Sequence, residues 1–156
     1  MDYAELLEEL QQQEQELIFD SFSNDDAFEL GMCIVKKAKE RKLPVAIEIT
    51  KNTQMIFHVS LEGTAQDNDE WLRRKANLVT RTGMSSYRIN IELRISGEAF
   101  EDRFHLTVED FAPAGGCFPV RVKGTGLVGT VAVSGLEMGD DHALVIEGIR
   151  EYMSQK

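Results

Sequence analysis

The sequence predicts an α/β domain of the α+β kind, in which helices pack on an antiparallel sheet. Several segments place apolar residues at helical spacing between start and stop signals, and two pairs of short apolar runs are joined by turn residues. The length of 156 residues suits about one domain, and 42% apolar residues with only 3 prolines are typical of a globular protein. We therefore expect one domain over residues 1–156.

The chain is expected to begin with a short amphipathic helix, residues 1–16, ahead of a core formed by residues 17–156. Three leucines share one face of this helix, and the glutamine-rich run QQQEQE gives it a solvated end. The next six residues, LIFDSF, predict a brief apolar strand.

Three later segments predict helices. SNDD supplies Ser23 as a cap and first-turn acids, and the basic run KKAKERK then suits the helix dipole before Pro44 ends the helix. DNDEWLRRKANLVTRTG repeats this pattern and stops at Gly83. GLEMGDDHALVIEGIREYMSQK predicts a last helix capped by Asp140 or Asp141.

Two hairpins are predicted from alternating runs. VAIEIT and QMIFHVS, separated by three residues, form the first, and CFPVRVK and TVAVSG form the second around GTGLVG. The G-x-G-x-x-G spacing of that turn would suit a dinucleotide only if a helix followed it. A strand follows instead, so Gly124 and Gly126 predict a hairpin tip, and Gly129 predicts a close approach by another backbone or side chain.

The segment SSYRINIELRIS fits two structures. Its strict alternation favours a strand, whereas Tyr87, Ile91 and Ile95 also lie four apart on a helix that Ser85 or Ser86 could cap. The residues alone leave both open. The following EAFEDRFHLTVEDFAPAGG predicts a long irregular connection.

The charge, the apolar segments and the cysteines indicate the partners and the compartment to expect. A net charge of −10 would repel nucleic acid, and the basic cluster Arg73-Arg74-Lys75 indicates a solvated helix face. No segment approaches the roughly 18 apolar residues of a membrane span, and the N-terminus lacks the pattern of a signal peptide. Cys33 and Cys117 favour buried free thiols. We expect a cytoplasmic protein without nucleic-acid or membrane partners.

The histidines are the first candidates for chemistry. His58, His105 and His142 have no metal-ligand spacing, so no metal site is predicted. His142 lies near a helix N-terminus beside two carboxylates, which would tune an imidazole in opposing directions. His58 lies in a predicted strand, where a hydrogen-bonded or exposed histidine is the ordinary role. No nucleophile motif accompanies them, so the catalytic residues stay unassigned.

Two blocks of the sequence resemble a known family. GGCFPVRVKGTGLVGTVAVSGL followed by DDHALVIEGI resembles the C-terminal signature of the haem-degrading-domain family, the GlcG/HbpS-like proteins. The stretches LPVAIEIT, QMIFHVSLEGTAQDNDEWLRRK and MSSYRI resemble one cytosolic branch of that family, so the likeness spans about residues 25–152. It implies a profilin-like or PAS-like three-layer sandwich, a central antiparallel sheet with helices on both faces, and a helix for SSYRINIELRIS.

The same resemblance implies a function and a place for it. Family members form dimers that assemble into rings or octamers, and some bind haem, so we expect a homo-oligomeric protein that binds haem or another anionic small molecule. The second hairpin and the start of the last helix should lie close together, with Arg121 available for a carboxylate or propionate. The candidate ligand-binding residues are His58, Trp71, Phe118, Arg121, Asp141 and His142.

Two other functions remain open at this point. One is a non-catalytic interaction scaffold that recruits proteins through its first helix or its oligomeric surface. The other is an enzyme acting on a small organic acid, with His142 as general acid or base and Asp141 as its partner.

Overall fold

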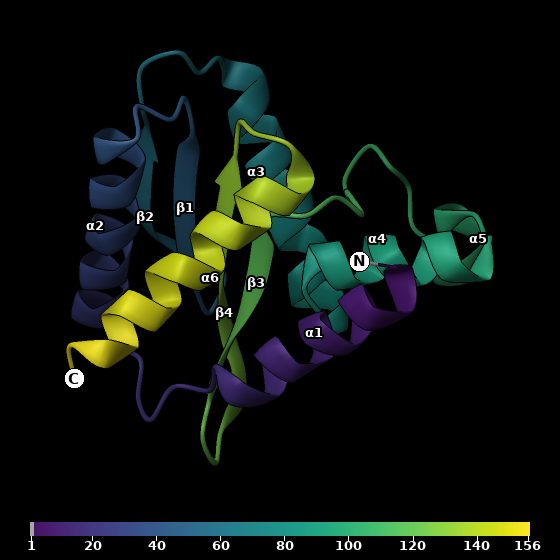
Figure 1. Cartoon of the computed structure of the whole chain (residues 1–156), viewed down its shortest axis with the longest axis horizontal. Helices are drawn as coiled ribbons and strands as arrows, with labels where there is room; N and C mark the ends of the chain where they lie inside the picture. Colours follow the sequence, from purple (N-terminus) through teal and green to yellow (C-terminus); the bar gives the residue numbers. More distant parts are fainter. Residues whose placement is uncertain (1) are drawn as a thin grey trace.

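A four-stranded antiparallel sheet forms the middle layer of the fold in the computed structural model, which describes residues 2–156 (Figure 1). The strand order is β2-β1-β4-β3. Both predicted hairpins are confirmed, since β1 pairs with β2 and β3 with β4. The strands are β1 (Ala46–Lys51), β2 (Gln54–Ser60), β3 (Cys117–Val122) and β4 (Gly126–Ser134).

Six helices surround this sheet in the described part of the chain. They are α1 (Tyr3–Glu16), α2 (Asn24–Glu40), α3 (Gln66–Thr82), α4 (Ser86–Ser96), α5 (Phe100–Phe104) and α6 (Met138–Ser154). Helices α2 and α6 cover one face of the sheet and α3 covers the other (Figure 1). The expected three-layer sandwich is thus confirmed. None of the described helices is both long and apolar enough to cross a bilayer.

Successive residues of β1 point to opposite faces of the sheet, and the two faces differ in the size of their side chains. Ile47 and Ile49 join the large core under α2 and α6, whereas Ala46 packs with α3. The α3 side of the sheet is built from small residues such as Cys117 and Ala132, so this helix can approach closely. It lies over β1, β3 and β4, and that placement leaves room beside β2.

Several local predictions are confirmed in atomic detail. Ser23 and Asp26 form a capping box at the start of α2, with bonds of 3.0 and 2.8 Å, and Gly83 ends α3 with a φ of 74°. Gly129 allows the predicted close approach, because a Cβ there would collide with the carbonyl oxygen of Thr50. The hairpin tip at Gly124 has a φ of 80°.

The segment SSYRINIELRIS is the helix α4, as the family resemblance implied and against its alternation. Ser85 caps it by accepting a hydrogen bond from the amide of Arg88 at 3.2 Å. The helix contacts α1, α3, α6 and β3, so it needs apolar residues on more than one side. Ile89 and Ile91 therefore both lie buried, and this arrangement imitates the period of a strand.

Three predictions about strands, connections and caps were wrong. LIFDSF forms no strand: only Phe19 pairs with Val122, through one isolated bridge. The connection after α4 contains the short helix α5. The cap of α6 is Glu137, whereas Asp140 and Asp141 lie within the first turn.

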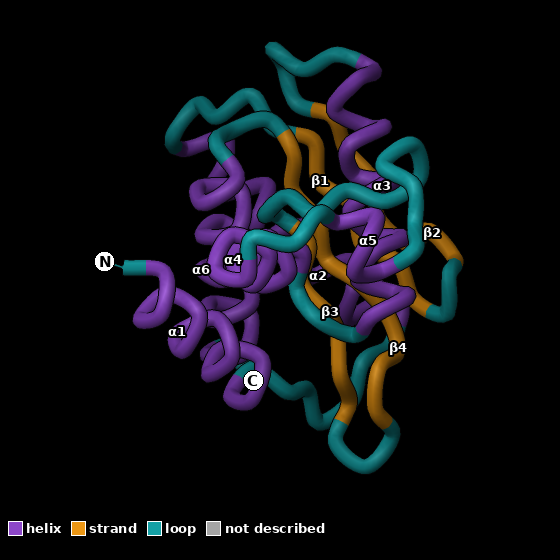
Figure 2. The backbone as a smooth tube through the Cα atoms, turned by 90° about the vertical axis from the view of Figure 1, so that its right-hand side faces the viewer, coloured by secondary structure: helices purple, strands orange, loops and turns teal. Residues whose placement is uncertain are grey.

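Helix α1 lies against α4 at the N-terminal side of the molecule (Figure 2). Leu10 is buried as its apolar face predicts. The glutamine-rich end was predicted to be solvated, but Gln13 and Glu14 are each only 8% exposed. Both side chains have partners inside the fold, so burial does not leave them unsatisfied.

Candidate functional site

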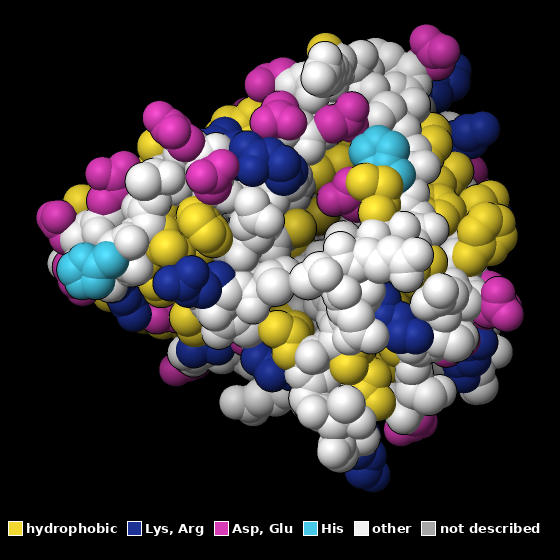
Figure 3. Space-filling model, turned by 180° about the vertical axis from the view of Figure 1, so that it is seen from behind, with side chains coloured by type: hydrophobic (Ala, Val, Ile, Leu, Met, Phe, Trp, Pro, Cys, Tyr) yellow, Lys and Arg dark blue, Asp and Glu magenta, His cyan; other side chains and the backbone are white. Residues whose placement is uncertain are grey.

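A cleft of about 510 Å³ opens between β2 and α3. Figure 3 shows this side of the molecule, where acidic, basic, apolar and histidine side chains meet at a hollow. We call it the β2–α3 cleft; its polar and apolar lining is Glu48, Thr50, Thr53, Met55, His58, Asp69, Glu70, Arg73, Ala76, Asn77 and Thr80. It therefore contains one of the residues predicted from the sequence, His58.

His58 is held by neighbours on both ring nitrogens. The strand register places it directly opposite Glu48, and its Nδ1 lies 3.2 Å from the Glu48 carboxylate. Its Nε2 lies 3.2 Å from the hydroxyl of Ser60 and 3.3 Å from Asp69. Burial raises the pKa of Glu48, and the neighbouring His58 opposes that rise. The carboxylate thus fixes the orientation of the imidazole.

The rim of the β2–α3 cleft is charged on one side and apolar on the other. Arg73 is exposed and forms ion pairs of 3.2 Å with Glu70 and 3.1 Å with Asp110. Met55 is 57% exposed on the edge strand. The cleft thus offers a cation, an imidazole and an apolar surface to a ligand.

A smaller pocket, of about 280 Å³, lies where α3 meets the start of α6. We call it the Trp71–Asp141 pocket because two of the predicted residues line it. Its lining is Asn68, Trp71, Lys75, Ala114, Gly115, Ser134, Gly135, Leu136, Met138 and Asp141.

Lys75 is the residue of this pocket that sequence reasoning misplaced. The basic cluster was interpreted as a solvated face, yet Lys75 is only 2% exposed. Its ammonium donates to the carbonyl oxygens of Val133 at 2.6 Å and Gly115 at 3.1 Å, and lies 3.5 Å from Asp141. It shares a helical face with Leu72, and that spacing is the signal that could have found it.

The glycines of the family signature make room for this lysine. Gly116 has a φ of 128°, and a Cβ there would collide with the Lys75 ammonium and the Val133 carbonyl. At Gly115 a Cβ would collide with the backbone of Met138. Both glycines are therefore needed for the close packing around the buried Lys75 ammonium.

Asp141 is the partner of Lys75 in the same pocket. Its side chain is buried and accepts a hydrogen bond from the amide of Leu136 at 2.9 Å. Burial raises the pKa of Asp141 to about 6, and Lys75 opposes the rise. Burial in turn lowers the pKa of Lys75. A carboxyl group that titrates near neutral pH beside a cavity marks a candidate functional site.

His142 and Phe118 lie inside the fold rather than in either cavity. His142 is 4% exposed, and its Nε2 lies 2.7 Å from the amide oxygen of Gln13. Its ring packs near those of Tyr87 and Phe118, at 5.2 and 6.2 Å between centroids. Burial lowers the pKa of His142 to about 4. Its side-chain partner is Gln13, whereas that of Asp141 is Lys75, so the two do not form the expected acid–base pair.

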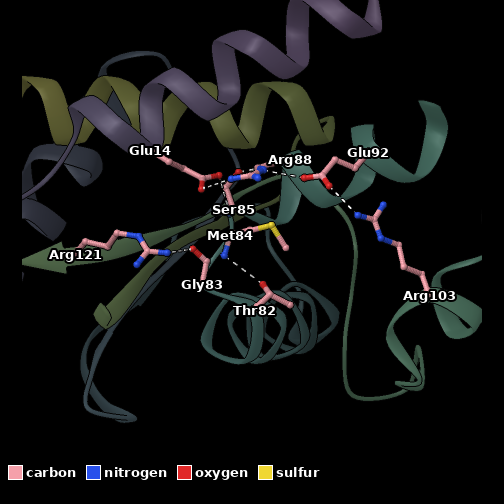
Figure 4. A network of polar contacts seen from close by, with 9 residues as sticks. All are labelled: Glu14, Thr82, Gly83, Met84, Ser85, Arg88, Glu92, Arg103 and Arg121. Atoms are coloured by element: carbon pink, nitrogen blue, oxygen red, sulfur yellow. Dashed lines mark hydrogen bonds and ion pairs between the residues drawn. The ribbon is translucent and has the colours of Figure 1, made fainter. Parts of the chain in front are cut away.

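Arg121 belongs to a separate polar network, shown in Figure 4, which joins α1, α4, α5 and β3. Its guanidinium donates to the carbonyl of Gly83, and Glu14 accepts from Arg88 at 3.0 Å and from the amide of Ser85 at 3.2 Å. Arg121 lines a groove of about 470 Å³ beside α1. The structure therefore brings only Trp71 and Asp141 of the six predicted residues into one pocket.

The cysteines differ from each other. Cys117 is buried as expected, and burial raises the pKa of its thiol to about 12, which keeps it inert. Cys33 was expected to be buried but lies half-exposed on α2. The described residues contain no group of three or more metal-ligating side chains.

The comparisons agree with the family that the sequence suggested. Residues 22–150 match the model of the family described as haem degrading protein HbpS-like. The chain belongs to this family.

Its relatives place it more narrowly. It is 43% identical over 152 residues to a UPF0303 protein of Streptomyces coelicolor, covering 97% of this chain and 96% of that protein. It is 44% identical over 143 residues to a UPF0303 protein of Rhizobium etli, covering 92% and 87%.

Two solved structures share the fold. The Ybr137w protein is 27% identical, with a TM-score of 0.88 over 96% of this chain and 88% of that one. The PduOC:heme complex is 17% identical, with a TM-score of 0.71 over 83% and 94%.

Proposed function

We propose that this protein binds haem in the β2–α3 cleft, with His58 as the ligand of the iron. The observation that carries the proposal is the pairing of His58 with the buried carboxylate of Glu48 beside the β2–α3 cleft. Histidines that ligate metals usually have their second ring nitrogen bonded to a carboxylate, carbonyl or water, which orients the ring.

The residues of the cleft fit haem in donor type and in size. A volume of about 510 Å³ lies within the range of roughly 300 to 1,000 Å³ usual for ligand sites. Arg73 supplies a cation for a propionate, and Met55 supplies apolar surface. Binding would exchange the contacts of His58 Nε2 with Ser60 and Asp69 for the iron. Bound haem would supply a redox-active iron.

The other two histidines are less suited to this role. His142 is enclosed behind Gln13 of α1, and His105 is exposed and lines none of the cavities described above. The family and the haem complex of a protein with the same fold support haem as the ligand class.

Titration with haemin, followed by Soret absorbance, tests the proposal. The wild-type protein should bind one haemin per chain and saturate, and His58→Ala should weaken binding at least about tenfold, the loss of about 1.4 kcal/mol. Glu48→Gln should give a smaller loss, and His105→Ala is the matched control that should bind as the wild type does. Binding that does not saturate, or that is equal in His58→Ala, would overturn the proposal.

We infer further that the protein is a cytoplasmic homo-oligomer. Strand β2 is an edge of the sheet and carries the exposed Met55. The neighbouring helix α2 carries the exposed Phe28 and Met32, so the two elements form one apolar surface. A second copy of the chain is the expected partner of this surface. Light scattering on Phe28→Lys and Met32→Lys should show smaller particles than the wild type, whereas Ile95→Lys on α4 should not change the mass.

The free thiols support a reducing compartment. The scaffold alternative is less well supported, because Leu10 of α1 is 1% exposed and packs within the fold.

A further inference from the structure

We propose that the Trp71–Asp141 pocket is a second binding site, for a small organic carboxylate whose charge is balanced by Lys75. It lies at the start of α6, apart from the β2–α3 cleft, and has no lining residue in common with that cleft. Its volume of about 280 Å³ suits a molecule of a few carbon atoms rather than a haem.

The pocket contains the buried ammonium of Lys75, which backbone groups hold in place. Two backbone carbonyls accept from the Lys75 ammonium, and Gly116 leaves the space that this ammonium occupies. A buried charge is costly unless it is paired, so Lys75 requires an anion. Asp141 is that anion while it is ionised, but at 3.5 Å and with a second bond to Leu136 it pairs only loosely.

The remaining titratable groups near the pair do not change the charge of the pocket between pH 5 and 8. Burial raises the pKa of Cys117 to about 12 and lowers that of His142 to about 4, so both stay neutral. Asp140 and Glu137, at the start of α6, are exposed and screened by solvent. The charge is therefore set by Lys75 and Asp141.

The other walls suit a small polar molecule. Trp71 precedes Lys75 by one helical turn, and Arg74 lies over its ring at 4.5 Å from the centroid. Asn68, a turn earlier on α3, accepts from the amide of Ala65 through its side-chain oxygen, so its amide nitrogen remains a donor for a ligand.

Binding in this site takes up a proton. When Asp141 is protonated, Lys75 lacks its counter-ion, and a ligand carboxylate can replace it while the neutral Asp141 donates a hydrogen bond. Because burial brings the pKa of Asp141 to about 6, this state becomes populated as the pH falls from 8 to 5. The affinity for a carboxylate should rise over that range by up to about tenfold per pH unit above the pKa.

Tryptophan fluorescence gives a direct measurement, because Trp71 is the only tryptophan of the chain. Sodium lactate is the probe, with sodium chloride at equal ionic strength and lactamide as controls. We expect saturable quenching by lactate alone, at least about tenfold tighter at pH 5 than at pH 8. Quenching by chloride or lactamide to the same extent would overturn the proposal, as would the absence of any saturable change.

Two variants test the roles of the charged pair. Asp141→Asn keeps an acceptor for Leu136 but removes the competing charge, so it should bind lactate at pH 8 at least about tenfold more tightly than the wild type. Asp140→Asn is the matched control on the exposed side of the same helix turn. Equal affinity of Asp141→Asn and the wild type at pH 8 would overturn the proposal.

Lys75→Met should abolish binding, with Lys36→Met, which changes an exposed lysine of α2, as its control. If Lys75→Met does not fold, Asp141→Asn still decides the question. His58→Ala separates the two sites, because it should weaken the binding of haemin and leave that of lactate unchanged, so either proposal can fail without the other.

Discussion

Replacing Lys75 by methionine should lower the free energy of unfolding by about 3–5 kcal/mol at pH 8. Methionine retains most of the apolar stem, so the effect comes from the charge rather than from a cavity. The change leaves the carboxylate of Asp141, which is 3% exposed, with only its backbone donors. An ion that loses its only buried partner keeps the cost of desolvation without the attraction that offset it.

The pH dependence of the unfolding free energy shows whether the loss in Lys75→Met comes from the charge of Asp141. The folded state raises the pKa of Asp141 from 3.8 to about 6, so its contribution to stability is full below pH 4 and is lost as the pH rises through 6. At about 1.4 kcal/mol per pKa unit, that loss is about 3 kcal/mol. Without Lys75 the pKa rises further, and the loss continues above pH 6. The deficit of Lys75→Met should therefore be larger at pH 8 than at pH 5.

Urea unfolding at both pH values measures these free energies, and the double variant Lys75→Met/Asp141→Asn should recover most of the loss at pH 8. Equal deficits at pH 5 and pH 8, or a double variant no more stable than Lys75→Met, would refute the reasoning and assign Lys75 to packing alone.

Three other substitutions have expected outcomes. Gly129→Ala should cost about 1–3 kcal/mol in urea unfolding, because its Cβ would collide with the carbonyl of Thr50 across the β1–β4 ladder. Burial keeps His142 neutral, so its contribution to stability is lost as the pH falls from 6.5 through 4; His142→Gln should remove up to about 3 kcal/mol of the difference in unfolding free energy between pH 7 and pH 4. Glu14→Ala should cost about 2 kcal/mol and speed hydrogen exchange in α1, because Arg88 loses its partner there.

Each of these substitutions has a control. Gly124→Ala places a Cβ in open space, so its cost measures only the strain of a φ of 80°, about 1 kcal/mol; a smaller cost at Gly129, which lacks such a φ, would argue against the close approach. His105→Gln changes an exposed ring and should keep the wild-type acid dependence. Glu16→Ala removes an exposed carboxylate of the same helix, and equal exchange rates in the Glu14 and Glu16 variants would contradict the anchoring role.

The local signals of the sequence were sufficient for most elements. Capping at Ser23, the stop at Gly83 and the glycine tip of the second hairpin are short-range features, and each appears as expected. The alternation of SSYRINIELRIS misled because α4 is packed on several sides. The strand predicted for LIFDSF does not form, because a strand needs a neighbouring strand along its length and only Phe19 pairs, with Val122.

The site was harder to predict than the fold. Trp71 and Asp141 share a pocket, but His58 and Arg121 lie in others. The burial of Lys75 was not predicted, because a run of basic residues usually marks a solvated helix face. No local pattern could reveal its partner, since Asp141 is far away in the sequence.

The sequence by itself determined the family, the helix boundaries at Ser23 and Gly83 and the two hairpins, because these depend on residues close together in the chain. Only the tertiary structure decided which charges are buried and which side chains meet. Lys75 and Asp141 become partners because α3 and the start of α6 meet at the end of β4, and Glu48 faces His58 because β1 and β2 pair in one register. Burial then sets the pKa values on which the chemistry of both sites depends.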